Sequence, residues 1–130
     1  MLRLLIVLIL VAHGIGHSIG VAGGWGANAW GGSGESWLLS PVLGRSVGIL
    51  EGLVWLLPAI GFVAAGAALW LGWDAWRVLA LASSVASLGA IALFPAQLPA
   101  FSAIAAVVVD VAVVVSLFVM EWPSADAVGA

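Results

Sequence analysis

Four residues that could do chemistry stand within long apolar stretches of this sequence: His13, His17, Glu51 and Asp110. A charged side chain at the centre of a membrane-spanning helix costs about 2.5–3.5 kcal/mol on insertion scales. Residues kept at such a cost are candidates for function. Imidazole and carboxylate groups can exchange protons, bind a metal ion or hold the polar part of a ligand.

The spacing of these residues predicts which of them meet. His13 and His17 are four residues apart, so both side chains point to one face of a helix. With a rise of about 1.5 Å per residue, we expect His17 about 9 Å below the outer membrane surface and Glu51 about 8 Å below it. His13 and Asp110 are each expected about 15 Å deep, near the midplane. The sequence therefore predicts that His17 pairs with Glu51 and His13 with Asp110, all in one interior site.

Three kinds of site fit this group of residues. The first is structural, with hydrogen bonds among the four side chains that fix the register of the helices. The second is a ligand-binding or proton-handling pocket, because a paired histidine and carboxylate exchange protons near neutral pH. The third is a single metal ion held by His13, His17 and Glu51, a two-histidine, one-carboxylate set that suits iron or zinc. Asp110 would then accept a hydrogen bond from a ligating histidine.

Four apolar stretches are long enough to position these residues in a membrane. A spanning helix needs about 20 mostly apolar residues. The stretches that meet this length are residues 4–23, 46–70, 76–94 and 100–120. Short linkers after the second and third stretches force neighbouring helices to run antiparallel. We therefore predict an all-α integral membrane protein, an antiparallel four-helix bundle in which residues 1–130 form a single membrane domain.

Glycines indicate where the first two spans pack closely. They recur at every fourth position in both spans, at Gly16, Gly20 and Gly24 and again at Gly44, Gly48 and Gly52. On a helix each set forms one stripe, and small residues in such stripes let helices approach closely in lipid. The glycine stripes are therefore predicted to face other helices of the bundle.

The longest connection between spans, residues 24–45, is rich in glycine and carries several tryptophans. Trp25, Trp30 and Trp37 lie in it, and tryptophan prefers the interface between membrane and water. We predict a loop on the outer surface that anchors the bundle there and could cover it.

The composition supports a membrane environment and excludes several functions. Hydrophobic residues make up 65% of the chain and charged residues 7%, whereas soluble domains carry about 25% charged residues. Three basic residues cannot form the patch that nucleic-acid binding requires. The absence of cysteine excludes disulfides, thiol redox chemistry and iron–sulfur ligation. The expected partners are the lipid bilayer and either another membrane protein or a second copy of this chain.

The arginines predict the orientation of the chain. Arg3 and Arg77 would lie on one face of the membrane and Arg45 on the other. Because basic residues favour the cytoplasmic side, we expect a multi-pass protein of the inner (plasma) membrane with both termini in the cytoplasm.

Several stretches also carry a family likeness. Arg3 precedes the first span and the run AHGIGHSIG; Glu51 enters the second span within GRSVGILEGLVWLLPAIG; the third span reads WRVLALASSVASLGAIALF. This order resembles the DoxX-like superfamily of small four-helix membrane proteins over most of the chain. Some DoxX-like proteins are linked to thiosulfate oxidation with quinone as acceptor, so the resemblance implies a redox-associated role and a site at Glu51. The paired histidines depart from the family pattern and imply a divergent member.

Together these features predict an inner-membrane protein whose bundle core binds a small apolar or redox-active ligand. A quinone or a lipid would bind at the histidine–carboxylate cluster, and the chain would act as an accessory subunit of a redox complex. The first alternative is a membrane enzyme that acts on a lipid or quinone with histidine and glutamate as acid and base. The second is a purely structural membrane subunit.

Overall fold

The computed structural model describes residues 1–27 and 30–129. Every regular element in this part of the chain is a helix, which confirms the predicted all-α class for these residues. Residues 28 and 29 of the predicted loop lie outside the described residues.

Within the described residues, four helical stretches are long and apolar enough to cross a membrane. They are Leu2–Gly24, Ser40–Leu71, Ala75–Leu93 and Ala100–Val119. Three of them end within two residues of the predicted bounds. The second begins earlier than the predicted residue 46, because a short helix and a 3₁₀ turn extend it into the loop.

The first stretch is interrupted at His17. Helix α1 (Leu2–Gly16) ends there and helix α2 (Ser18–Gly24) begins. The backbone N–H of His17 lies 3.3 Å from the carbonyl of His13 and 3.2 Å from that of Gly14, so one donor is shared between two acceptors. Glycine is a weak helix former, and the glycines on either side of this turn favour such an irregularity.

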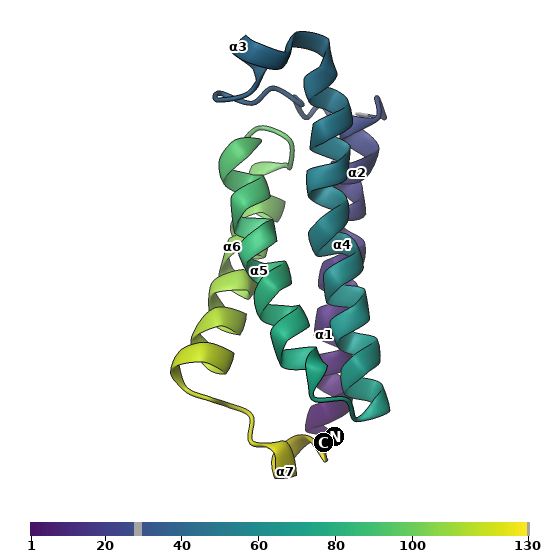
Figure 1. The fold of residues 1–130 in the computed structure, drawn as a ribbon, viewed down its shortest axis with the longest axis vertical. Coiled ribbons are helices and arrows are strands. Elements are labelled where there is room, and N and C mark those ends of the chain that lie inside the picture. The colour runs from purple at the N-terminus through teal and green to yellow at the C-terminus, as the bar shows by residue number, and fades with distance from the viewer. Residues whose placement is uncertain (28–29, 130) are drawn as a thin grey trace.

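The remaining elements follow in chain order. They are α3 (Ser40–Leu43), the 3₁₀ helix η1 (Gly44–Ser46), α4 (Val47–Leu71), α5 (Ala75–Leu93), α6 (Ala100–Val114), the π-helix η2 (Val115–Val119) and α7 (Ala125–Val128). Helix α4 packs against α1, α2 and α5, and α5 packs against α6. Figure 1 shows both chain termini at the end of the molecule opposite α3.

Glycines set the distance between α4 and the first span. A Cβ atom at Gly20 would lie 2.3 Å from the ring of Trp55, and one at Gly24 would lie 2.4 Å from the backbone nitrogen of Gly52. A Cβ at Gly48 would meet the carbonyl of Gly24 at 2.9 Å. These glycines therefore face the helix contact, as their spacing predicts.

The first glycine of each stripe, Gly16 and Gly44, departs from the prediction. An added Cβ at Gly16 or Gly44 meets nothing within 4 Å. Gly16 borders a cavity on the side of α6, and Gly44 lies before α4 in a turn with a φ of 53°. Gly14 makes the close contact in α1, where a Cβ would lie 2.8 Å from the carbonyl of Ala59.

The loop between the first two spans folds over the connection between α5 and α6. The indole N–H groups of Trp30 and Trp37 donate to the carbonyls of Gln97 and Ala92, at 3.1 and 2.7 Å. The backbone N–H of Ser33 donates to the carbonyl of Ala96 at 3.0 Å. These two tryptophans therefore hold the loop to the end of α5 and to the connection that follows it.

The two arginines near the other end hold the C-terminal segment to the helices. Arg3 donates to the carbonyls of Trp70 and Gly129, and Arg77 donates to that of Pro123. Val128 of α7 is buried in the core cluster that also contains Leu10, Leu69 and Trp76.

Candidate functional site

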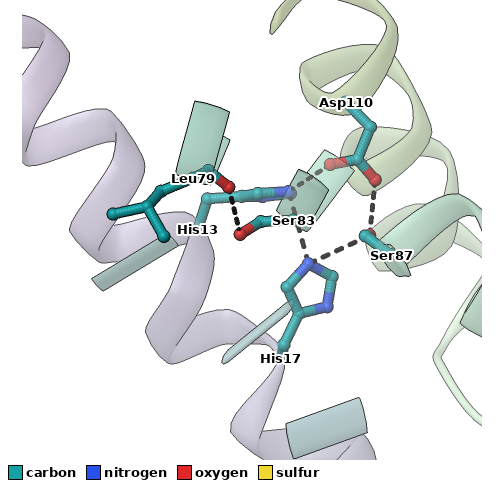
Figure 2. A network of polar contacts seen from close by, with 6 residues as sticks. All are labelled: His13, His17, Leu79, Ser83, Ser87 and Asp110. Atoms are coloured by element: carbon teal, nitrogen blue, oxygen red, sulfur yellow. Dashed lines mark hydrogen bonds and ion pairs between the residues drawn. The ribbon is translucent and has the colours of Figure 1, made fainter. Parts of the chain in front are cut away.

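His13 and Asp110 form the centre of a buried polar network. Nε2 of His13 lies 2.9 Å from Oδ1 of Asp110, which joins α1 to α6 (Figure 2). The side chain of Asp110 is fully buried and that of His13 is 11% exposed. The predicted pairing of these two residues by depth is confirmed.

Ser87 of α5 connects this pair to His17. Its hydroxyl donates to Oδ2 of Asp110 at 2.5 Å, and its oxygen lies 3.1 Å from Nε2 of His17. Ser87 and His17 are both buried. The network therefore draws on α1, the turn at His17, α5 and α6, as Figure 2 shows.

The two histidine rings approach each other through their Nε2 atoms. Nε2 of His13 and Nε2 of His17 lie 3.3 Å apart, so each of these nitrogens has two polar neighbours. An imidazole nitrogen carries either one hydrogen or one lone pair. The contacts with Asp110 and Ser87 already use that single capacity, so the approach of the two nitrogens is not explained by hydrogen bonds alone.

Aromatic side chains of α4 hold both rings in place. The ring of Phe62 lies 4.6 Å from that of His13 and 5.9 Å from that of His17, measured between centroids. Trp55 lies 5.6 Å from the ring of His17. Phe62 and Trp55 are completely buried, so the histidines are restrained by packing on one side and by polar contacts on the other.

Glu51 does not belong to this network. It is buried near the start of α4. Its carboxylate lies against Gly34 of the loop, so closely that a Cβ atom at Gly34 would be 2.3 Å from Oε2. Among the described residues, Oε1 of Glu51 has no hydrogen-bond partner. The predicted contact between His17 and Glu51 does not form, because Trp55, one turn further along α4, occupies the side facing His17.

The predicted metal-ligand set changes for the same reason. One potential ligand atom from each of His13, His17 and Asp110 lies within 4.8 Å of the others. Asp110 therefore supplies the carboxylate that the sequence assigned to Glu51. The role of Glu51 in ligand binding or proton handling stays a prediction.

Ser87 is the residue of the network that sequence reasoning did not place among the candidates. Three serines recur on the inward face of α5, at Ser83, Ser84 and Ser87. The hydroxyl of Ser83 donates to the carbonyl of Leu79 in its own helix at 2.6 Å (Figure 2). The buried serine face was a usable signal, but it could not show which serine meets the carboxylate.

A cavity of about 240 Å³ opens beside the two histidines. It lies between the first span and α6, and Ser102 is the only other described residue in its lining with a polar side chain. The described residues that line it are Ala12, His13, Gly16, His17, Ile19, Leu98, Phe101, Ser102, Ala105, Ala106 and Val109. We call this space the upper cavity; it combines an apolar wall with a polar end formed by the histidines.

A second cavity, of about 280 Å³, lies further along the same two helices. Its lining is apolar apart from Ser116 and the indole N–H groups of Trp76 and Trp122, and the C-terminal segment borders it at Trp122 and Pro123. Val109, the residue before Asp110, forms part of the wall of both this lower cavity and the upper one.

The chain matches no protein-family model, no curated protein and no solved structure. We therefore infer its function from the geometry of the site.

Proposed function

We propose that this chain is a multi-pass membrane protein whose core binds a quinone-type ligand at the upper cavity. The observation that carries the proposal is the lining of this cavity, in which His13 and His17 form a polar end and nearly every other residue is apolar. Ligand sites combine an apolar wall with a few placed polar groups in this way.

The membrane setting is supported by the surface of the helices. Large apolar side chains are exposed on each long helix, for example Leu8, Ile49, Val85 and Val108. Soluble monomers rarely expose continuous apolar surface of this kind, whereas lipid solvates it. We propose that the four long helices form an antiparallel bundle in the inner (plasma) membrane, with the Gly- and Trp-rich loop at the outer surface.

The size of the upper cavity favours a small headgroup. Pockets for drug-sized molecules measure about 300–1,000 Å³, and this one measures about 240 Å³. A single ring with two carbonyl oxygens fits this range and accepts hydrogen bonds. The network uses Nε2 of both histidines, and Nδ1 of each ring forms no hydrogen bond among the described residues. In a neutral ring that donates from Nε2, Nδ1 is an acceptor. We therefore propose that Nδ1 of the histidines accepts from a hydroxyl of the reduced (quinol) form, and that the hydroxyl of Ser102, in the same lining, donates to an oxygen of the quinone.

The lower cavity extends the proposal to the tail of the ligand. Its nearly apolar lining suits a hydrocarbon chain attached to the ring, and Val109 lines both cavities. We propose that the chain passes beside Val109 from the upper cavity to the lower one. The DoxX-like resemblance is in keeping with a quinone, and it stays a proposal.

Replacing Gly16 with leucine tests the site without disturbing the helix contacts. An added Cβ at this position meets no atom within 4 Å, yet Gly16 lines the upper cavity. Leucine is also the better helix former. We expect the variant to fold and to bind a short-tailed quinone, decylubiquinone, at least tenfold more weakly than the wild type. Equilibrium binding to purified protein in nanodiscs measures this.

The matched control is Gly89→Leu in α5, where an added Cβ also meets nothing within 4 Å and which lines neither the upper nor the lower cavity. It should bind decylubiquinone as the wild type does. Equal binding by Gly16→Leu and wild type would contradict the proposed site. A wild type that binds no quinone would favour a structural subunit.

Terminal reporter fusions test the orientation. Arg3 and Arg77 both lie at the end of the molecule that carries the termini, and Arg45 lies in the loop at the other end. By the positive-inside rule, fusions at either terminus should be active with a reporter that works only in the cytoplasm. They should be inactive with a reporter that works only outside. An outside C-terminus would refute the orientation.

A further inference from the structure

We infer that His13, His17 and Asp110 form a binding site for one divalent transition-metal ion of the iron or zinc class. One potential ligand atom from each residue lies within 4.8 Å of the others. The inference concerns the Nε2 side of the histidine rings, and it is independent of the ligand proposed for the cavity.

The contact between the histidines is the first argument. The two Nε2 atoms lie 3.3 Å apart, and each already has a partner in Asp110 or Ser87. If both nitrogens carry hydrogens toward these oxygens, the two N–H dipoles meet unfavourably. If either nitrogen presents its lone pair, it gives up its bond to the oxygen. An ion between the two nitrogens uses both lone pairs and removes this conflict.

The distances are the second argument. Nitrogen ligands lie about 2.0–2.1 Å from zinc, so two of them at a tetrahedral angle are about 3.3 Å apart. The observed separation of the two Nε2 atoms is 3.3 Å. Nε2 of His13 and Oδ1 of Asp110, at 2.9 Å, match two ligands at about a right angle on one ion. The two ligand atoms that lie furthest apart would each have to move by less than about 1 Å, through side-chain rotation, to bind the same ion.

The surroundings of the three residues are the third argument. Ligating carboxylates and histidines are usually oriented by further contacts. Ser87 donates to the second oxygen of Asp110, and Phe62 packs against both imidazole rings. Asp110 is completely buried, and its ion-pair partner among the described residues is His13, which is charged only when protonated. A histidine that binds a metal is neutral, so the metal cation would then balance this buried carboxylate.

The chemistry of the set indicates what the ion could do. Two imidazoles and one carboxylate leave coordination positions open on iron or zinc. His13 and His17 also line the upper cavity. A water molecule or an oxygen of a bound molecule could take an open position from that side.

Cobalt is the probe that tests this site. The protein is purified in mild detergent, stripped with EDTA and titrated with Co²⁺ alone while visible absorption is recorded. We expect one Co²⁺ per chain, with d–d bands distinct from those of free Co²⁺, and displacement by Zn²⁺. His17→Gln and Asp110→Asn should each weaken Co²⁺ binding at least tenfold, whereas Ser84→Ala and Asp74→Asn should bind as the wild type does.

The titration of the wild type decides the proposal even if a variant fails to fold. A wild type without new bands overturns the site, and so do unchanged bands in folded His13→Gln and His17→Gln. Decylubiquinone binding to the EDTA-stripped protein is measured in parallel. Quinone binding without cobalt binding overturns only the metal site, and cobalt binding without quinone binding overturns only the proposed ligand.

Discussion

Replacing Gly24 with leucine is expected to prevent the first span from packing against α4. A Cβ at this position would lie 2.4 Å from the nitrogen and 2.8 Å from the Cα of Gly52, and 2.9 Å from the carbonyl of Gly48. All three atoms belong to the backbone, so no side-chain rotation can relieve the clash. We expect a loss of at least about 3 kcal/mol in the free energy of unfolding, at the upper end of the range for overpacked cores.

Unfolding in mixed detergent and SDS micelles, followed by circular dichroism, measures this loss. Gly89→Leu serves as the control, because the same side chain is added at a helical glycine with no atom within 4 Å. It should lower the free energy of unfolding by less than about 0.5 kcal/mol, and the higher helix propensity of leucine favours a small gain instead. Equal stability of the two variants would contradict the close packing of α2 against α4.

Replacing Asp110 with leucine is expected to have the second large effect. The carboxylate accepts contacts from His13 and Ser87 and is completely buried. Hydrogen bonds between membrane helices contribute about 0.6 kcal/mol on average, but each buried polar group that is left without a partner costs about 1–3 kcal/mol. Because Asp110→Leu leaves two polar groups without their partner, we expect a loss of about 3 kcal/mol.

A double replacement distinguishes the interaction between His13 and Asp110 from the cost of replacing either residue alone. In His13→Leu/Asp110→Leu both members of the pair become apolar, while the contact between Ser87 and His17 can persist. Replacing both partners by apolar groups is often close to neutral. The double variant should therefore be more stable than Asp110→Leu by at least about 1 kcal/mol. Val111→Leu, an exposed neighbour in α6, is the control. Additive losses would show that the two side chains are not coupled.

The long elements of the fold follow directly from the sequence. Length and apolar character are properties of a single stretch, so the four candidate spans could be located without knowing their neighbours. The extension of the second span to Ser40 and the small helix α7 were not predicted. Both are short, and α7 is held by contacts with distant residues, such as the bond from Arg3 to Gly129.

The candidate site was predicted in part. Helical spacing placed His13 and His17 on one face, and depth paired His13 with Asp110. The same depth argument wrongly joined Glu51 to His17. Depth specifies how far along its helix a residue lies, but not toward which neighbouring helix its side chain points. In α4 it is Trp55, and not Glu51, that points toward His17. To identify Ser87, one must know how α5 is oriented about its own axis. The three buried serines on one face of α5 do not specify that orientation.

Photo-crosslinking tests the proposed quinone site most directly. A quinone carrying an azide on its ring is bound to the protein in nanodiscs and activated by light, and the labelled peptides are mapped by mass spectrometry. The proposed site predicts adducts within residues 12–19 and 98–109, which line the upper cavity. Excess decylubiquinone should suppress them, and Gly16→Leu should lack them. Adducts spread along the lipid-facing sides of all four helices, unaffected by the competitor, would contradict a specific site beside His13 and His17.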